Sequence, residues 1–399
     1  MEKASTVAEL VGRYPPVEPT FLFRPHLLKA AAETFVNRFP ATPFYAVKAN
    51  PAPHILQGLW QAGVRRFDTA SIGEVRAVRA VLPEAELAFL HPVKPEPAIA
   101  EAYHVHGVRA FVLDCAGELA KILRATGNAQ DLTLLVRVHV SNEGAAKPLA
   151  GKFGASAIEA PGLLQAARAH AQRLGVSFHV GSQALNPDAW RRAMADLSAL
   201  ITTAGTIVDI VNVGGGFAVP YGVSGMEAPP PMDTYAAAIS SAFEDMVVRE
   251  NAELWCEPGR ALVAEAESLL CRVDGVKPGA VYLNDGSFGA LYDVVHEGWA
   301  FPYRCFDAAG QELAGPMAAV TVYGPTCDSA DRFPEPLLLP ETLEAGSYVE
   351  FGTIGAYGRS LATRFNGFGS YCTCEVLDAP WVSAFAENVT NPSKSGTVG

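Results

Sequence analysis

Two patterns of hydrophobic positions divide the chain near residue 264. Between about residues 26 and 263, short and nearly continuous apolar runs alternate with segments whose apolar residues recur every third or fourth position. Such runs are typical of strands buried on both faces, and the recurrence is the helical period. The predicted strands are FYAVKA, RFDTAS, ELAFLHP, AFVLDC, LTLLVRVHV, SFHVGSQ, IVNVGGGF and ELWCEPGR. Eight strand–helix units favour a closed (β/α)8 TIM-type barrel over an open doubly wound sheet.

The predicted helices follow the same alternation. An opening helix is expected over PHLLKAAAETFVNRF, at residues 25–39. Amphipathic segments then separate the strands: HILQGLWQAG, GEVRAVRAVL, GELAKILRA, LLQAARAHAQRLG and DAWRRAMADLSALITTAG. The chain is therefore an α/β protein over this stretch.

After residue 264 the helical period fades and short β-type runs appear between glycines and prolines. They are SLLCRVDGV, AVYLNDG, AAVTVYGP, PLLLP, SYVEFG and GSYCTCEVL. This pattern predicts an antiparallel β-sandwich or β-barrel domain, to which the first 20 or so residues add a strand. We predict a (β/α)8 barrel over residues 24–264, a β domain over 1–23 and 265–385, and a flexible tail over 386–399.

Composition excludes several classes of protein. Apolar residues make up 49% of the 399 residues, which provides a large core and excludes wholesale disorder. The net charge of -12 argues against binding to a nucleic-acid backbone. No apolar run approaches the roughly 20 residues of a membrane span, and MEKASTVAELVGRYPP lacks an apolar signal core. We therefore expect a cytoplasmic protein that binds neither nucleic acid nor membrane.

Ionisable or glycine-rich residues follow nearly every predicted strand. In a (β/α)8 barrel the catalytic groups gather at the carboxyl ends of the strands. Each residue alone is explained as a helix cap, a turn or a satisfied polar group, but the whole set predicts an active site. The set is Lys48, Asp68 with Ser71, His91, Asp114, Arg137 with His139, His179 with Ser182, Gly214 to Gly216, and Glu257 with Arg260.

Lys48 lies in the apolar run FYAVKAN. A lysine there must face the barrel mouth or be buried at a high cost in free energy. Desolvation lowers the pKa of a lysine amine, which favours Schiff-base formation. The alternative is a surface lysine whose charged end reaches solvent.

Three glycines, Gly214 to Gly216, directly follow the run IVNV. Backbone N–H groups in such a turn can close on a phosphate, with help from the positive end of the next helix. Arg260 of CEPGR offers a second anion contact from the next strand end, where barrels of this class commonly bind phosphate. A tight turn explains the glycines alone, but the two motifs together predict a phosphorylated cofactor.

Glu257 ends the eighth predicted strand beside this phosphate site. A lysine, a phosphate cradle and an acidic partner for a ring nitrogen are what pyridoxal phosphate requires. His179 of SFHVGS is expected to stack on the ring, and Ser182 is expected to reach the phosphate. We therefore predict pyridoxal 5'-phosphate as the cofactor, without a metal.

Nine motifs, taken in order, resemble the pyridoxal-phosphate decarboxylases of the alanine-racemase-like fold. They are FYAVKAN, FDTAS, FHVGSQ, VNVGGGF, CEPGR, LNDG, GPTCDSADRF, GAYG and RFNGF, between about residues 20 and 378. The chain is most similar to the ornithine decarboxylase branch, which also holds lysine, arginine and diaminopimelate decarboxylases. The resemblance implies a barrel with a β domain, and a head-to-tail homodimer whose active sites lie at the subunit boundary.

The resemblance also implies a role for each matching residue. Lys48, His179 and Cys327 would be catalytic, with Lys48 forming the Schiff base and Cys327 reprotonating the carbanionic carbon after CO2 leaves. Asp328 would bind the distal amine of the substrate, and both Cys327 and Asp328 would come from the partner subunit. Phe365 of RFNGF would line the pocket. The cofactor contacts would be Lys48, Asp68, Glu74, Arg137, His179, Ser182, Gly214, Gly215, Gly216, Glu257, Gly259, Arg260 and Tyr357.

The segment after LNDG departs from the ornithine enzymes, which carry Tyr-Asp there to hold the distal amine. Counting from LNDG places His296 and Glu297 at that position, whereas Asp293 of LYD takes it if the segment is shorter. We predict a basic L-amino acid as substrate, with L-ornithine first, giving putrescine and CO2. Lysine and arginine are the alternatives, and diaminopimelate is disfavoured because HEGWAF and GPTCDSA hold no arginine for its distal carboxylate.

Three other functions compete with decarboxylation. A racemase of this fold usually carries a catalytic tyrosine where this chain has GPTCD. A non-catalytic regulatory homologue would have lost Lys48 or Cys327, and both are present. A phosphate-binding barrel unrelated to pyridoxal phosphate is the last alternative.

Overall fold

The computed structural model describes residues 2–141, 145–147, 151–221, 227–296, 298–378 and 383–385. The chain forms two compact units. The first unit is made of Ala32–Val219 and Pro229–Ala261, and the second is made of the described parts of Met1–Ala31, Pro220–Ala228 and Leu262–Gly399. The tail predicted over 386–399 lies outside the described residues.

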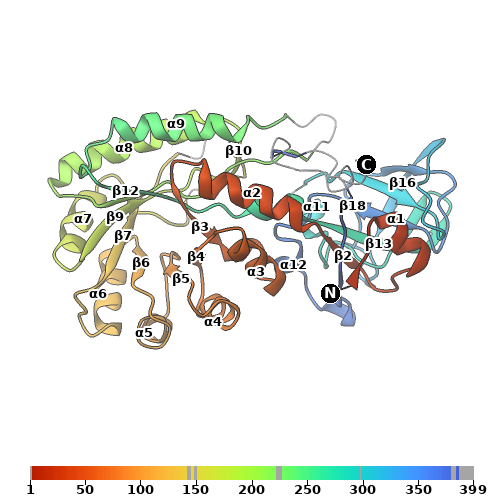
Figure 1. Ribbon diagram of the computed structural model, residues 1–399, viewed down its shortest axis with the longest axis horizontal. Coiled ribbons are helices and arrows are strands. Elements are labelled where there is room, and N and C mark those ends of the chain that lie inside the picture. The colour runs from red at the N-terminus through yellow and green to blue at the C-terminus, as the bar shows by residue number, and fades with distance from the viewer. Residues whose placement is uncertain are drawn as a thin grey trace, which may run out of the picture. The chain divides into compact units, whose positions relative to one another are not determined.

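Within the described residues, parallel strands close the first unit into an eight-stranded barrel (Figure 1). In order around the barrel they are β3 (Thr42–Ala46), β4 (Arg66–Thr69), β5 (Glu86–Phe89), β6 (Ala110–Leu113), β7 (Thr133–Arg137), β9 (Arg173–Ser177), β11 (Ile210–Asn212) and β12 (Glu253–Cys256). Strand β12 pairs in parallel with β3 and completes the ring. The predicted (β/α)8 barrel is confirmed.

A helix follows each barrel strand in the chain. These helices are α3 (Pro53–Gln61), α4 (Ile72–Val81), α5 (Glu96–His104), α6 (Ala116–Ala125), α7 (Ala160–Arg168), α8 (Asp188–Ala204), α9 (Met232–Glu244) and α10 (Arg260–Val263), with α2 (Pro25–Asn37) before β3. Helix α8 shows the local rule, because it buries Trp190, Met194, Leu197 and Ile201 at helical spacing. It ends at Gly205, whose left-handed φ of 58° is favourable for glycine.

The sixth barrel strand begins earlier than the sequence predicts. The pattern assigned Arg173 to Gly175 to a helix and began the strand at Ser177, but α7 ends at Arg168 and β9 spans Arg173–Ser177. Gly175 is required by packing, since a Cβ atom there would lie 2.9 Å from the Leu135 side chain. As a result, His179 and Ser182 lie beyond the carboxyl end of the strand, toward the barrel mouth.

The barrel interior is a packed core. Large and small side chains from different strands fill it: Phe44, Ala88, Leu90, Ala110, Val112, Leu135, Ile210 and Trp255. The rings of Phe44 and Trp255 lie 4.4 Å apart between their centroids. Close packing makes the barrel a rigid frame for the loops at its carboxyl end.

The second unit holds a nine-stranded sheet within the described residues. Its strands are β1 (Glu2–Lys3), β2 (Thr20–Phe23), β13 (Glu267–Lys277), β14 (Ala280–Leu283), β15 (Tyr303–Phe306), β16 (Met317–Tyr323), β17 (Leu337–Pro340), β18 (Tyr348–Phe351) and β19 (Cys372–Glu375). The N-terminal stretch does add strands, as predicted. The shorter elements are α1 (Val7–Arg13), α11 (Tyr292–His296), α12 (Gly358–Leu361), and the 3-10 turns Ala264–Ala266 and Phe365–Gly367.

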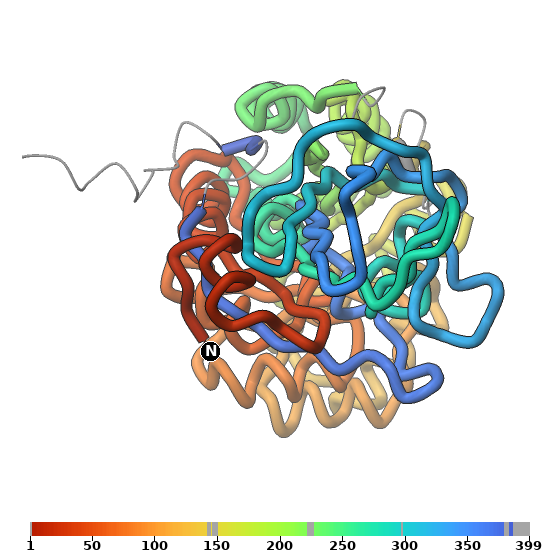
Figure 2. The backbone as a smooth tube through the Cα atoms, turned by 90° about the vertical axis from the view of Figure 1, so that its right-hand side faces the viewer, coloured from red at the N-terminus to blue at the C-terminus, as the bar shows by residue number. Residues whose placement is uncertain are grey.

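This sheet is mixed, which corrects the prediction of an antiparallel domain. Strand β13 pairs antiparallel with β2, β14 and β18, but β19 lies parallel between β1 and β2. Figure 2 shows the red N-terminal and blue C-terminal segments running beside each other. Local patterning gives the strand but not the direction of a neighbour far away in the chain, so the prediction failed there.

Within the described part of the chain, the length and hydropathy of the helices leave none that could span a membrane.

Candidate active site

A cavity of about 420 Å³ lies at the mouth of the barrel. It is lined by Lys48, Asp68, Ala70, Leu90, His91, Arg137, Lys152, Phe153, His179 and Glu257. Six of these residues belong to the set predicted from the strand ends. The barrel therefore brings together residues that lie up to about 200 positions apart in the chain.

Lys48 lies outside the strand in which the sequence predicted it. Strand β3 ends at Ala46, and Lys48 occupies the single 3-10 turn Val47–Ala49. The turn is held by a hydrogen bond from the Ala46 N–H to the Pro258 carbonyl (3.1 Å). Val47 and Ala49 are buried while the Lys48 side chain is exposed and faces the cavity. The Lys48 amine is therefore accessible to a ligand in the cavity and is not buried within a strand.

Two carboxylates share this cavity with the cations of Lys48 and Arg137. Burial raises the pKa of Asp68 well above its ordinary value, and the negative charge of Glu257 raises it further. Burial also raises the pKa of Glu257. The charges of Lys48 and Arg137 and a hydrogen bond from Asn212 oppose this rise. The positive charges of Lys48 and Arg137 oppose the rise in the pKa of Asp68 as well.

His179 is a neutral ring in this environment. Its Nδ1 atom accepts a hydrogen bond from the Gly181 N–H (3.0 Å), which places the proton of the neutral imidazole on Nε2. Desolvation lowers the pKa of His179 well below its ordinary value, and the charges of Lys48 and Arg137 lower it further. The cavity therefore contains a flat, uncharged ring that can stack on a ligand.

The three glycines after β11 form a tightly packed loop. A Cβ atom on Gly214 would lie 2.2 Å from the Phe178 carbonyl oxygen, and one on Gly216 would lie 2.3 Å from that of Gly181. A Cβ atom on Gly215 would lie 2.5 Å from the Glu257 carbonyl oxygen. Because only glycine permits these approaches, the loop packs closely against the ends of two neighbouring strands.

Of the other predicted phosphate residues, three belong to the first unit and one, Tyr357, to the second. Ser182 begins the short strand β10 (Ser182–Ala184), which pairs with β8 (Ala145–Lys147), and the Ala184 N–H donates to the Gly216 carbonyl (2.9 Å). A Cβ atom on Gly259 would lie 3.2 Å from the Cβ atoms of both Ala46 and Ala49, so Gly259 packs closely against them. Arg260 is buried and begins α10. Tyr357 belongs to the second unit, where it adopts a left-handed φ of 67° before α12.

Glu74 supports a helix start and also interacts by charge with Lys48 and Asp68, near which the resemblance places it. It lies in the first turn of α4, where its carboxylate accepts from the Ala70 N–H (2.7 Å). Ser71 caps the same helix by accepting from the Glu74 N–H (3.2 Å). This arrangement is similar to a capping box, but Glu74 accepts from the residue before the N-cap. Neither side chain lines the cavity.

Sequence reasoning missed a wall of the cavity. Lys152 and Phe153 belong to a loop after β7 that is held back onto the barrel by Asp114, whose carboxylate accepts from the Gly154 N–H (3.0 Å). The Phe153 ring meets His91 edge to face, with 5.0 Å between centroids. No local pattern marks these residues, because their place depends on the loop folding back.

Asn212 was also missed. It is fully buried at the end of β11, and its amide contacts both Gly214 and Glu257. The one sequence signal was an asparagine inside an apolar strand, two residues before the first of three glycines.

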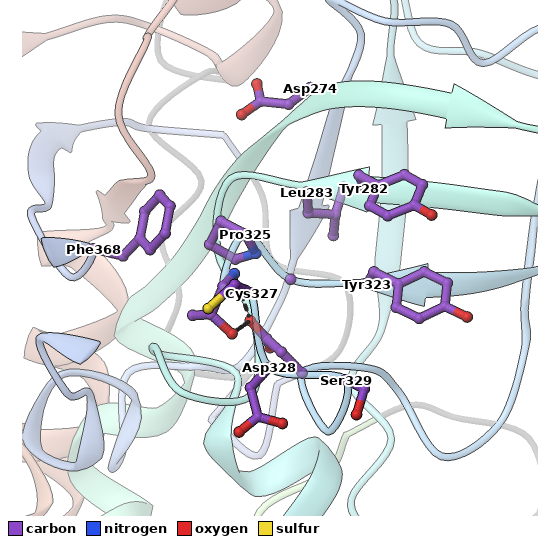
Figure 3. A pocket seen from close by; sticks show the side chains of 12 residues that line it. Asp274, Tyr282, Leu283, Tyr323, Pro325, Cys327, Asp328, Ser329 and Phe368 are labelled. Carbon is purple, nitrogen blue, oxygen red and sulfur yellow. Dashed lines mark hydrogen bonds between the residues drawn. The ribbon is translucent and has the colours of Figure 1, made fainter. Parts of the chain in front are cut away.

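The second unit has its own pocket, of about 410 Å³, around Cys327 (Figure 3). Its lining is Asp274, Tyr282, Leu283, Tyr323, Gly324, Pro325, Thr326, Cys327, Asp328, Ser329, Asp331 and Phe368. The exposed Cys327 thiol donates to the Asn366 side-chain oxygen (3.1 Å), which also accepts from the Cys327 N–H (3.1 Å). Asp328 is exposed beside it. The structure thus places the predicted acid and the predicted amine-binding carboxylate in one pocket.

Asp331 fixes the loop that carries Cys327. Its buried carboxylate accepts from the N–H and hydroxyl groups of Ser287 (2.8 and 2.9 Å) and of Thr326 (3.0 and 2.7 Å). These contacts connect the segment after LNDG to GPTCD. The sequence did not single out Asp331, whose only signal was a second aspartate in CDSAD.

The segment predicted to read the substrate forms helix α11. Asp293 is buried there, with 5% of its surface exposed. His296 is exposed, and its ring stacks on Tyr292 with centroids 4.0 Å apart. Glu297 lies outside the described residues. Phe365 is exposed in the second unit, and its ring lies 5.0 Å from that of Phe288.

Comparison with known proteins identifies the family. A family model described as the pyridoxal binding domain of pyridoxal-dependent decarboxylases matches residues 26–264, which span the barrel. The chain belongs to the pyridoxal-dependent decarboxylase family. This confirms the family and the cofactor, pyridoxal phosphate, that the nine motifs predicted, and it goes against the racemase and the unrelated phosphate-binding barrel.

Several decarboxylases of this family are similar to the chain. A lysine/ornithine decarboxylase of Selenomonas ruminantium is 32% identical over 386 residues, covering 94% of this chain and 91% of that protein. An ornithine decarboxylase of Caenorhabditis elegans is 32% identical over 353 residues, covering 82% and 79%.

Solved structures agree with these relatives. The arginine decarboxylase of Paramecium bursaria Chlorella virus has a TM-score of 0.81 at 27% identity, covering 92% of this chain and 99% of that one. A lysine/ornithine decarboxylase of Vibrio vulnificus complexed with cadaverine has a TM-score of 0.79 at 28% identity, covering 94% and 100%.

Proposed function

We propose that the chain decarboxylates a basic L-amino acid, and that this substrate is L-ornithine, giving putrescine and CO2. The observation that carries the proposal is the barrel cavity, where Lys48 faces Glu257, Asp68 and the neutral ring of His179. The names of the relatives, which include lysine/ornithine, ornithine and arginine decarboxylases, support a basic substrate. Lysine and arginine are the alternatives.

The residues at the barrel mouth fit pyridoxal phosphate. Lys48 would bind it covalently, Glu257 would face its ring nitrogen, Asp68 and Arg137 would lie near the ring, and His179 would stack on it. Its phosphate would be held by Ser182, Gly215, Gly216, Gly259, Arg260 and Tyr357. Gly214 would support this site by fixing the loop, since its N–H donates to Asn212. When bound, this cofactor supplies a sink for the electron pair left behind as CO2 departs.

The charges of these residues suit that task. A carboxylate at Glu257 stabilises a protonated ring nitrogen, and the hydrogen bond from Asn212 supports the charged form of the carboxylate. His179, being neutral, packs against a ring without adding positive charge beside Lys48 and Arg137. The partial burial of His179 and Glu257 strengthens the electrostatic interactions among these groups.

Cys327 would provide the proton that completes the reaction. Its thiol holds a proton at Sγ and directs it to the Asn366 oxygen. In a head-to-tail homodimer the thiol would instead face the partner's cofactor and protonate the α-carbon of the substrate. Its exposure in a pocket of the second unit supports a role toward another chain.

Carboxylates near Cys327 would select the substrate. A cationic end in a partly desolvated pocket needs paired charges, since an unpaired charge there is costly. Asp328 is one such carboxylate, with Phe365 as an apolar wall. Glu297, with His296 beside it, or the buried Asp293 would be the second. Loss of binding for cationic substrates in Glu297→Ala, but not in Asp293→Ala, would assign the role to Glu297.

Borohydride reduction of the cofactor-loaded enzyme, followed by peptide mapping, tests the central assignment. We expect the label on Lys48. Lys152 lines the same cavity and provides the matched control, so Lys152→Ala must keep the label while Lys48→Ala loses it. A label on Lys152 or on any other lysine would contradict the assignment.

A panel of ornithine, lysine, arginine, 2,4-diaminobutyrate and diaminopimelate tests the substrate. We expect amine release from ornithine to have the highest kcat/KM. Preference for lysine or arginine would replace the ornithine proposal within the same class, and preference for diaminopimelate would reject a basic substrate.

A further inference from the structure

Asn212 connects two parts of the site that the sequence treats separately. It is the last residue of β11 and is fully buried. Its side-chain Nδ2 donates to the Glu257 Oε1 atom at 2.7 Å, and its Oδ1 accepts from the Gly214 N–H at 3.0 Å. One amide therefore contacts the carboxylate and the first glycine of the loop.

The chemistry of the contacts determines the orientation of this amide. The Gly214 N–H is a donor, so the oxygen of Asn212 must face it, and the NH2 group must then face Glu257. The backbone repeats the connection, since the Glu257 N–H donates to the Gly214 carbonyl at 2.8 Å. Glu257 therefore cannot move relative to the glycine loop without breaking several hydrogen bonds.

The amide also opposes the effect of burial on Glu257. Burial favours the protonated form of this carboxyl group, whereas a donated hydrogen bond favours the charged form. Lys48 from the turn after β3, Arg137 from β7 and Asp68 from β4 also face this carboxylate. Asn212 differs from these groups because it supports the charge without carrying one.

We propose that Asn212 is a positioning residue that directs Glu257 toward the cofactor ring and joins it to the glycine loop that would hold the phosphate. This inference rests on the proposed cofactor contacts of Glu257 and of the glycine loop, Gly214 to Gly216, as a whole. It adds a residue that contacts neither the reacting atoms nor the substrate.

Two substitutions separate the contacts of Asn212. Asn212→Leu keeps a similar volume and removes both hydrogen bonds. Asn212→Asp keeps the acceptor for the Gly214 N–H but presents an oxygen to Glu257 where a donor stood. If Asn212 only anchors the loop, the aspartate variant should bind pyridoxal phosphate like the unmodified protein. If Asn212 supports Glu257, the aspartate variant should lose affinity for pyridoxal phosphate as both carboxylates ionise.

The experiment is a titration of the cofactor-free protein with pyridoxal phosphate, followed by visible absorbance between about pH 6 and pH 9. For N212L we expect at least tenfold weaker binding, the scale of one lost hydrogen bond to a charged group. For N212D we expect the ratio of its dissociation constant to that of the unmodified protein to rise with pH. Thr126→Val removes a buried hydrogen bond elsewhere in the same unit and should keep full affinity.

The outcomes are distinct. Unchanged affinity in N212L, or an N212D ratio that stays near one at every pH, overturns the role of Asn212 and leaves the proposed function intact. Failure of the unmodified protein to bind pyridoxal phosphate overturns the proposed function itself. If the melting temperature shows that N212L is unfolded, Asn212→Ser replaces it, because serine cannot span both partners.

Discussion

At the scale of single residues, we predict that Cys327 determines the product rather than the release of CO2. Its thiol carries a proton in an exposed pocket, and a carbanionic substrate carbon needs a nearby acid. In Cys327→Ala we expect CO2 release to continue while the proton adds to the cofactor carbon instead, which yields an aldehyde and the amino form of the cofactor. Quantifying amine and aldehyde by chromatography checks this, and clean amine from the variant would show that the proton comes from another group.

The buried carboxyl group of Asp285 predicts a pH-dependent stability. Burial raises its pKa to about 7, despite hydrogen bonds from the Ala290 N–H (2.9 Å) and the Tyr371 hydroxyl (3.2 Å). The folded protein therefore binds a proton that the unfolded chain releases near pH 4, so its contribution is full below about pH 4 and is lost as pH rises through about 7. In Asp285→Asn we expect the fall in melting temperature between pH 4 and pH 8 to become smaller.

The exposed Asp274 of the same unit is the control for this titration. It pairs with Arg272 at 2.7 Å near the surface, so Asp274→Asn should leave the pH profile unchanged. A D285N profile parallel to that of the unmodified protein would show that Asp285 titrates normally.

At the scale of elements, the close packing of the loop after β11 requires glycine, because a side chain there would meet backbone atoms. In Gly215→Ala the new methyl group would lie 2.5 Å from the Glu257 carbonyl oxygen, so β11 and β12 would have to separate. We expect a loss of several kcal/mol in the free energy of unfolding and weaker binding of pyridoxal phosphate.

Gly162 provides the matched control for this substitution. It lies in α7, where a Cβ atom would meet nothing within 4 Å. Gly162→Ala should stabilise the protein by about 0.5–1 kcal/mol through helix propensity. Denaturant unfolding of both variants measures the contrast, and equal effects at the two positions would contradict the packing argument.

At the scale of the whole molecule, the proposed homodimer predicts complementation between inactive subunits. Lys48 belongs to the first unit and Cys327 to the second, and a shared site would take one from each subunit. Mixing Lys48→Ala with Cys327→Ala subunits should restore up to about a quarter of the amine-forming activity, because random pairing gives one intact site in half of the dimers. No recovery after demonstrated subunit exchange would argue for sites built within one chain.

Much of this architecture could be predicted because its signals are local. The alternation of apolar runs with helical spacing gave the barrel, and Lys48, His179 and Glu257 were located by their place after strands. Boundaries were less secure, as the early start of β9 shows. Its Gly175 is required by the Leu135 side chain of a neighbouring strand, which no local pattern contains.

The sequence by itself determined the (β/α)8 class, the glycine loop and the family, since periodicity and short motifs are properties of neighbouring residues. Only the tertiary structure decided that Asn212 joins Glu257 to Gly214, that Phe153 folds back as a wall of the cavity, and that β19 lies parallel between β1 and β2. Each of these depends on contacts between residues far apart in the chain. Such contacts arise from packing and hydrogen-bond geometry, which exist only once the chain has folded.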